Sequence, residues 1–453
     1  MLFSLTNPEV AILMMGIFLF AVLLGFPIAF TLMAMGIGFG YYAYYDPVLM
    51  DHIFDNRIFS LFVKNTYTVM DNTVLTAVPL FLFMGYLVER AGIVSRLFFA
   101  IRLASHRLPA SMAVAALVTC ALFSTATGII GAVVTLMGLL AWPAMIRAGY
   151  DKKFASGVIC SGGCLGILIP PSIMLIVYSV IAQLSPLRLF AAAIFPGLLL
   201  AGLYIGYAVT LAYFNPSIAP KPPKEDIPPR SVILKEVMVS FLPLFSLIIL
   251  VLGTILGGLA TPAEAAAVGA FGALVLSYFY KTLKWKNFKE SVFLTAKTTA
   301  MIMWLFIGSW TFASVFSYLG GHEVFEHFFK SMDLQPWQFL VITQIIIFLL
   351  GWPLEWTEIL IIFVPIFLPL VAFFEVNPYF FAMLIALNLQ TSFLTPPMAM
   401  SAYYLKGVQS KNVELMEIFK GIMPFLGIVI LAMFLMYLFP GIALWLPDTL
   451  FAN

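Results

Sequence analysis

Charged residues are scarce in this chain, and its polar loops are short. Only 10% of the 453 residues are Asp, Glu, Lys or Arg, whereas 62% are hydrophobic. A soluble domain carries roughly 25% charged residues, so this composition excludes a soluble enzyme or binding domain of ordinary size. Many apolar runs are long enough for a membrane span of about 20 residues. The sequence therefore predicts an all-α, polytopic protein of the lipid bilayer.

Motifs for metal binding and catalysis are missing as well. The three cysteines lie inside apolar segments and are interpreted as small buried hydrophobic residues. The four histidines form no ligand motif, and neither Gly-x-Ser-x-Gly nor His-Glu-x-x-His occurs. We therefore expect neither an enzyme nor a bound cofactor. A net charge of +2 without a basic, aromatic patch does not indicate nucleic-acid binding. Because no phosphate loop for ATP is present, any transport should be driven by an ion gradient.

Two apolar segments are interrupted by a Pro-Pro pair, for which a plain membrane helix has no use. The first pair, Pro170-Pro171, lies between Gly166 and Ser172, and the second is Pro396-Pro397. Proline removes a backbone donor and clashes with the preceding turn. In hydrocarbon, freed backbone groups are tolerated only where protein or a watery cavity satisfies them. We therefore expect broken helices that line a cavity, and we assign these residues and Pro79 to the substrate path or its gate.

The two breaks belong to a longer internal similarity. A shift of 226 positions superposes the Pro-Pro pairs and several neighbours, among them Met174 on Met400 and Tyr178 on Tyr404. Interrupted segments at corresponding positions of two halves indicate the binding site of a transporter. The paired loops of the two halves also switch between basic and acidic or mixed character. An inverted repeat predicts this switch when each half crosses the membrane an odd number of times.

The predicted organisation follows from this similarity and from the strongest boundary in the chain. Six prolines and mixed charges make residues 215–230 an extended polar segment. The expected parts are a first repeat at residues 1–214, a cytoplasmic Pro-rich linker at 215–236, and a second repeat at 237–453. Both termini should then lie outside the cytoplasm.

Oxygen-bearing side chains beside the helix breaks are the candidate cation ligands. An ionisable residue inside a span is a functional candidate, because burying its charge costs about 2.5–3.5 kcal/mol or more. Glu355 and Glu358 are three residues apart on one helical face, where they either complete a cation site or lie at a water interface. Glu264, after Thr261, either caps a helix or serves an ion. Sodium prefers oxygen ligands, and its candidate ligands are Ser124, Thr125, Thr127, Gly128, Glu355, Thr357, Glu358 and Thr395.

Five short sequences, in this order along the chain, resemble the large membrane subunit of tripartite ATP-independent periplasmic (TRAP) transporters. They are Val78-Pro-Leu-Phe-Leu-Phe-Met-Gly85, Ile169-Pro-Pro-Ser-Ile-Met-Leu-Ile-Val-Tyr178, Phe195-Pro-Gly197, Thr261-Pro-Ala-Glu-Ala-Ala-Ala267 and Thr395-Pro-Pro397. The resemblance implies sodium-driven import of an organic acid across the bacterial inner membrane. It also implies an elevator-type fold and two partners, a small four-helix membrane subunit and a periplasmic solute-binding protein.

The resemblance further implies positions for two re-entrant hairpins and two unwound helices. The hairpins fall on the Pro79 segment and near residues 298–320, and the unwound helices fall near Thr125–Gly128 and Glu355–Glu358. The short apolar run that ends at Glu89 also favours a hairpin by its length. Two departures from the family pattern, Ser124-Thr-Ala-Thr-Gly128 and Glu355-Trp356, leave the solute open.

Two other functions stay open at this point. One is a standalone ion-coupled carboxylate carrier with the same inverted-repeat architecture. The other, from a different class, is a membrane scaffold that translocates nothing, although a scaffold offers no reason for paired helix breaks.

Overall fold

The computed structural model describes residues 5–48, 50–221, 229–409 and 412–451, and within these ranges the chain is helical and contains no β-strand. Seven of the described helices are long and apolar enough to cross a membrane, or eight if a bent pair counts as one span. This architecture confirms the predicted all-α, polytopic class.

The helices of the first half are α1 (Asn7–Leu23), α2 (Ile28–Ala43), η1 (Ile53–Asp55), α3 (Arg57–Met70), α4 (Ala77–Arg90), α5 (Ile93–Ala104), α6 (Ser111–Thr127), α7 (Ile130–Arg147), α8 (Lys152–Cys164), η2 (Leu165–Ile167), α9 (Ile173–Ala182) and α10 (Pro186–Phe214). Those of the second half are α11 (Arg230–Leu256), α12 (Pro262–Phe279), α13 (Trp285–Tyr318), α14 (Gly321–Ser331), α15 (Pro336–Leu350), α16 (Trp356–Glu358), η4 (Ile359–Phe363), α17 (Val364–Phe373), α18 (Pro378–Ser392), α19 (Met400–Val408), α20 (Leu415–Leu438) and α21 (Gly441–Leu450).

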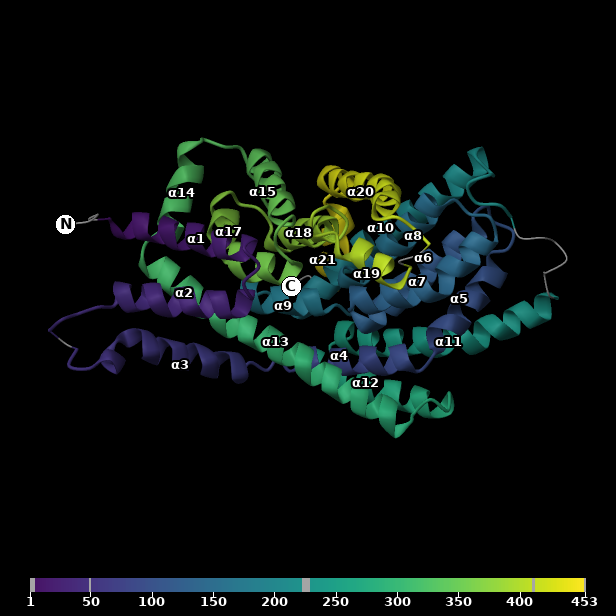
Figure 1. Ribbon diagram of the computed structural model, residues 1–453, viewed down its shortest axis with the longest axis horizontal. Coiled ribbons are helices and arrows are strands. Elements are labelled where there is room, and N and C mark those ends of the chain that lie inside the picture. The colour runs from purple at the N-terminus through teal and green to yellow at the C-terminus, as the bar shows by residue number, and fades with distance from the viewer. Residues whose placement is uncertain (1–4, 49, 222–228, 410–411, 452–453) are drawn as a thin grey trace.

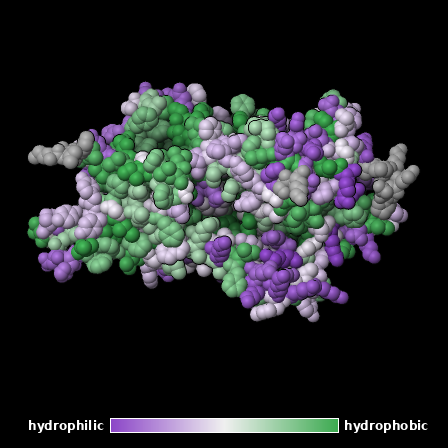
Figure 2. All heavy atoms as spheres, in the orientation of Figure 1, coloured by the Kyte–Doolittle hydropathy of each residue, from purple (hydrophilic) through white to green (hydrophobic). Residues whose placement is uncertain are grey.

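These helices form two groups that lie against each other (Figure 1). In the first, α13 packs along α2, α3 and α4, and α12 packs between α4 and α11. In the second, α8 packs on α6, α7 and α20, and α18 packs on α15 and α20. Figure 2 shows that hydrophilic residues gather over the α12–α13 connection, where Lys281, Lys284 and Lys286 lie.

One helix overturns a predicted hairpin. Residues 298–320 do not fold back, because α13 runs as one 34-residue helix from Trp285 to Tyr318. At a rise of 1.5 Å per residue it is about 51 Å long. The Pro79 segment forms α4, whose axis is bent by 67° relative to that of α5. This pair changes direction without becoming antiparallel.

A hairpin with its tip at the cavity-forming segment is formed by α6 and α7 instead. Its tip is Gly128-Ile129, and its two far ends meet where the backbone N–H of Met112 donates to Tyr150 Oη at 3.2 Å. Met112 lies in the first turn of α6 and Tyr150 follows α7, so the helices run side by side in opposite directions. The predicted unwound helix at Thr125–Gly128 is therefore the tip of a hairpin.

The second hairpin is formed by α15 and by the helix that runs from Trp356 through η4 to the end of α17. The rings of Phe339, at the start of α15, and Phe374, just after α17, stack with centroids 4.5 Å apart. The tip lies between Gly351 and Glu355. The predicted unwound helix at Glu355–Glu358 is thus also a hairpin tip, and it lies 226 positions after the first one.

The helix breaks lie at the two Pro-Pro pairs, as predicted. The first separates α8 from α9, and the second separates α18 from α19. Both pairs contain a cis peptide bond. The interrupted helices also start alike, because Asp151 caps α8 at Phe154 N and Asn377 caps α18 at Phe380 N. The order of hairpin and broken helix therefore recurs in the two halves.

Two further details concern sequence-based predictions. The helix α11 begins at Arg230, inside the segment assigned to the linker, and residues 222–228 of that linker lie outside the described ranges. Glu264 is exposed, and its Oε2 accepts hydrogen bonds from Thr261 N at 2.7 Å and Thr261 Oγ1 at 2.9 Å. This capping box ties Glu264 to the start of α12. Helix capping, the first of its two readings, accounts for Glu264.

Candidate functional site

Both hairpin tips and both helix breaks meet at one cavity of about 140 Å³. Residues of α4 and α13, which belong to the first group of helices, close the cavity on one side. Its lining is Leu82 of α4, Gly128, Ile129, Ile130 and Gly131 of the first tip, Ile167 and Ile173 of the first break, Thr298, Met301 and Ile302 of α13, Glu355, Trp356 and Thr357 of the second tip, and Phe393, Met400 and Tyr404 of the second break. This cavity is the candidate substrate site.

Four helices point their N-termini at this cavity. Ile130, Ile173, Trp356 and Met400 are the first residues of four helices, and all four line it. Each N-terminus presents the positive end of a helix dipole, equivalent to roughly +0.5 charge, although the N–H groups of Ser401 and Ala402 at the start of α19 are already bonded to backbone carbonyls. No Lys, Arg or His side chain lines the cavity in the described part of the chain. The donors that the cavity offers to an anion are therefore backbone N–H groups and the hydroxyls of Thr298, Thr357 and Tyr404.

Each hairpin tip packs tightly on the neighbouring helix break. A Cβ atom added to Gly166 would overlap the backbone C and O atoms of Ser124. In the second half, a Cβ added to Gly351 would lie 2.9 Å from Ser392 Cβ. Tip and break therefore touch at one glycine in each half, although the glycine belongs to the break in the first half and to the tip in the second.

A serine bridges each helix break. Ser172 Oγ donates to the Ile167 carbonyl at 2.5 Å, and Ser401 Oγ donates to the Phe393 carbonyl at 2.7 Å. These carbonyls lie where the helical hydrogen bonds stop, so the hydroxyls satisfy part of the backbone that the prolines free. Ser172 was predicted as a gate residue, and the structure gives it this bridging contact.

The hydroxyl residues predicted as cation ligands fall into two groups. Ser124 Oγ donates to the Cys120 carbonyl, Thr125 Oγ1 donates to the Ala121 carbonyl at 2.6 Å, and Thr395 Oγ1 donates to the Thr391 carbonyl at 2.9 Å. The buried Oγ1 atoms of Thr127 and Thr357, one at each hairpin tip, find no partner among the described residues. These two oxygens are free to bind an ion or solute.

The two glutamates of the second tip occupy different environments. Glu355 lines the cavity at the N-cap of the helix, whereas Glu358 is only 5% exposed and does not line it. Glu358 Oε2 has no hydrogen-bond partner in the described ranges. Because Glu358 is buried, it does not lie at a water interface. The π-helical turn η4 follows directly, and π-helical turns are frequent at functional sites.

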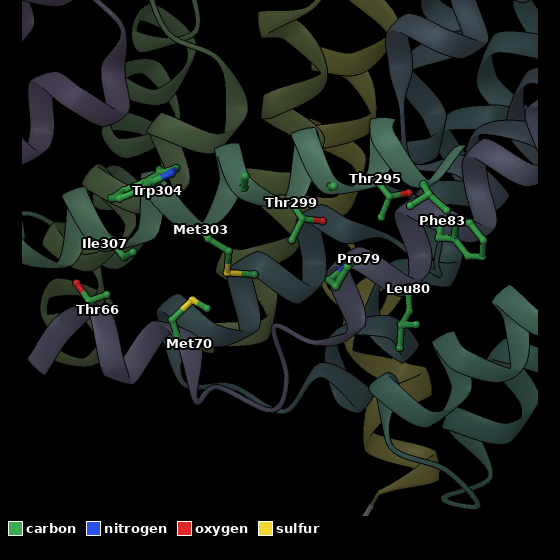
Figure 3. Close-up of a pocket in the computed structure, with 13 residues that line it drawn as sticks. Thr66, Met70, Pro79, Leu80, Phe83, Thr295, Thr299, Met303, Trp304 and Ile307 are labelled. Carbon is green, nitrogen blue, oxygen red and sulfur yellow. The ribbon is translucent and has the colours of Figure 1, made fainter. Parts of the chain in front are cut away.

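Some predicted gate residues lie away from the cavity. Pro79 lines a separate apolar groove of about 790 Å³ between α3, α4 and α13, and Figure 3 shows it beside Leu80, facing Thr299 and Met303. The first Pro-Pro pair is buried, whereas Pro396 and Pro397 are exposed. The Pro-Pro pairs thus shape the breaks without lining the cavity themselves.

Sequence reasoning missed the wall contributed by α13. Thr298, Met301 and Ile302 carry no motif, and their segment was expected to be a hairpin. Tyr404 could have been found, because the 226-position shift already paired it with Tyr178. Groups of three or more His, Cys, Asp or Glu side chains that could hold a metal ion do not occur among the described residues.

Paired hairpin tips and broken helices around a central cavity define a polytopic membrane transporter. The family described as tripartite ATP-independent periplasmic transporter, DctM component, matches residues 15–442. The chain therefore belongs to this family, and it is a transporter permease subunit and not an enzyme.

Individual relatives cover most of the chain. It is 28% identical over 393 residues to the C4-dicarboxylate TRAP transporter large permease protein DctM of Pseudomonas aeruginosa, covering 86% of this chain and 90% of that protein. It is 30% identical over 383 residues to the sialic acid TRAP transporter large permease protein SiaM of Vibrio cholerae, covering 84% and 87%. The crystal structure of the Alcanivorax borkumensis YdaH transporter shares the fold, with a TM-score of 0.60, 15% identity, and coverage of 96% of this chain and 99% of that chain.

Proposed function

We propose that this subunit imports a small organic anion, namely a carboxylate, across the bacterial inner membrane and that a sodium gradient drives the import. The observation that carries the proposal is the convergence of four helix N-termini on one cavity. Because these termini are positive and no basic side chain lines the cavity within the described ranges, backbone N–H groups and the hydroxyls of the lining would hold the anion. The relatives named for dicarboxylate and sialic acid support an acidic solute.

Sodium is the proposed coupling ion. Broken membrane helices supply carbonyl oxygens that coordinate Na⁺ in transporters, and both breaks lie next to a hairpin tip here. The free Oγ1 atoms of Thr127 and Thr357 and the free Oε2 of Glu358 add side-chain oxygens. A buried carboxylate oxygen without a partner is costly, and a bound cation would compensate its charge. A cation bound by Glu358 at the second tip would also lie close to Glu355, the glutamate that lines the cavity.

The proposed mechanism is an elevator in which the group that carries the tips and breaks slides along α4 and α13. The two halves would be inverted repeats of each other. A sliding contact needs small residues, and Gly85 of α4 supplies one, because a Cβ there would lie 2.7 Å from Thr127 Cα at the first tip. The second Pro-Pro pair is exposed, whereas the first is buried. We therefore infer that the cavity opens on the side of the protein where the second helix break lies.

The proposed partners are the small four-helix membrane subunit and the periplasmic solute-binding protein of a TRAP system. The apolar groove between α3, α4 and α13 (Figure 3) offers a lipid-facing surface outside the cavity that could accept a helix of the small subunit. By the positive-inside rule, the lysines of the α12–α13 connection support a cytoplasmic position for it. Both termini would then lie outside the cytoplasm.

Uptake into proteoliposomes tests this function. The vesicles would hold this chain, its small membrane subunit and its cognate binding protein, and a panel of organic acids would be offered with and without an inward sodium gradient. We expect uptake that needs sodium and a free carboxylate, so the amide analogue of a transported acid should fail. Uptake without the binding protein would instead indicate a standalone carrier, and sodium-independent uptake would refute the coupling.

A matched pair of glutamate variants tests the cation site. Glu358→Gln removes a charged oxygen ligand, and the sodium concentration for half-maximal uptake should rise by about tenfold, corresponding to a charged interaction of about 1.5 kcal/mol. Glu264→Gln changes a glutamate at the start of another helix, where it caps the backbone in solvent, and should leave the sodium dependence unchanged. Equal sodium dependence of both variants and the wild type would exclude Glu358 from the site.

A further inference from the structure

A second hollow lies on the outer side of the helices that carry the cavity. It is a groove of about 520 Å³ that is lined by residues of α15, α18 and α20. Figure 1 shows these three helices next to one another. Ile345 of α15 and Phe434 of α20 form rims that are more than half exposed, so the groove is open to the outside.

The floor of this groove is polar, although the rest of its lining is almost entirely apolar. Gln344, Asn388 and Thr391 line the floor and are 8%, 2% and 1% exposed, respectively. The fold does not require these side chains, because the 226-position shift places Val118, Gly162 and Leu165 at the corresponding sites of the first half. Polar residues in a membrane segment are rare and usually have a function.

The hydrogen bonds of the floor run in one direction and end on an unused donor. Thr391 Oγ1 donates to the Asn388 carbonyl at 2.7 Å, and Asn388 Nδ2 donates to the Gln344 carbonyl at 2.7 Å and to Gln344 Oε1 at 2.9 Å. This order fixes the orientation of both amides, so Gln344 Nε2 is left over. Nε2 is buried and has no hydrogen-bond partner in the described part of the chain. A ligand that completes the floor must therefore bring an acceptor.

The position of Gln344 along α15 identifies the ligand. This helix has 15 residues and is about 22 Å long, which is half of a bilayer about 40–45 Å thick with its headgroups. It enters at Trp337, whose ring lines the outer end of the groove together with Tyr437, as interfacial aromatics do. Gln344 lies two turns deeper, and its side chain points back towards the N-terminus of the helix. Its amide thus reaches the region where lipid ester groups lie.

We propose that this groove is a binding site for a diacyl phospholipid. An acyl chain lies along the apolar walls between Val341 and Phe434, and the ester carbonyl accepts a hydrogen bond from Gln344 Nε2. The headgroup remains at the level of Trp337. The lipid moves with the helices that carry the cavity, and its binding does not depend on which solute the protein transports.

Two lipids that differ only in their linkage test the contact. The full chain, purified with any membrane subunit that accompanies it, is titrated in detergent with a diacyl phospholipid or with its dialkyl ether analogue, and bound lipid is measured by native mass spectrometry. The ether lacks the carbonyl, so it should bind about threefold more weakly, as expected for a membrane hydrogen bond of average strength. Equal binding of the two lipids would overturn the proposed contact.

Three variants separate the contact from nonspecific lipid binding. Gln344→Leu should abolish the preference for the diacyl lipid, while Asn388 keeps its bond to the Gln344 backbone carbonyl at 2.7 Å. Ile430→Trp should block the groove and lower the binding of both lipids. Leu431→Trp is the control, because its side chain is exposed on the same helix but does not line the groove. Identical lipid binding by all three variants, or a copurifying polypeptide in place of lipid, would refute the site.

Discussion

Adding one methyl group to Gly166 should disrupt the contact between the first hairpin tip and the first helix break. The new Cβ would overlap the backbone of Ser124, which lies in the last turn of α6 and cannot rotate away as a side chain can. Overpacking of a core typically costs 1–3 kcal/mol, and we expect Gly166→Ala to reach the upper end, about 3 kcal/mol. That cost lowers the ratio of folded to unfolded protein by about a hundredfold.

Two other glycines supply graded controls for this prediction. Gly351→Ala would place its Cβ 2.9 Å from Ser392 Cβ, whereas the new Cβ at Gly166 would lie much closer than that to Ser124 C, so Gly351→Ala should be less destabilised. Gly202→Ala meets nothing within 4 Å in the middle of α10, and it should gain up to about 1 kcal/mol of helix propensity. Thermal unfolding in detergent and uptake in proteoliposomes measure both consequences. If the Gly166→Ala variant were as stable as the Gly202→Ala variant, the inference of a tight contact between the first tip and the first break would be refuted.

Three further substitutions test separate features. Tyr150→Phe removes the acceptor of Met112 N–H and should destabilise the first hairpin by about 1–3 kcal/mol, measured by thermal unfolding. Gly85→Val should slow uptake because it blocks the sliding contact, while solute binding to the soluble partner stays unchanged. Uptake by this variant at the wild-type rate would argue against an elevator that slides on α4. Burial lowers the pKa of His322, so its stabilising contribution is present above the unfolded pKa of about 6.5 and is lost as the pH falls below it. His322→Gln should therefore make the free energy of unfolding less dependent on pH between pH 7 and 5, as measured in unfolding experiments.

Much of the membrane architecture could be predicted from local chemistry. Apolar runs at residues 9–24, 28–45, 188–214 and 263–280 predict four spans, and the ends of α1, α2, α10 and α12 lie within about two residues of them, because long apolar runs and their polar ends determine where a helix can cross. The helix breaks at the Pro-Pro pairs were predicted correctly for the same reason, since proline interrupts a helix in any environment.

The candidate site was predicted only in part. Gly128, Glu355 and Thr357 line the cavity, as their positions beside the breaks indicated. Pro79 does not line it, because α4 turns that side chain towards the groove on the other face of α13. The contribution of α13 was missed, since its apolar residues resemble those of any lipid-facing helix.

The sequence by itself determined that the protein is a membrane protein, that its helices break at the Pro-Pro pairs, and that residues around the two breaks match after a shift of 226 positions. These properties follow from hydropathy, from proline chemistry and from residue identities that a simple shift reveals. Whether the chain reverses or continues at an interruption was decided by the tertiary structure. Met112 and Tyr150, and likewise Phe339 and Phe374, are far apart in the sequence and in contact in the fold. A turn signal is local, but the reversal depends on these distant contacts, and they place the hairpin tips and four helix N-termini around one cavity.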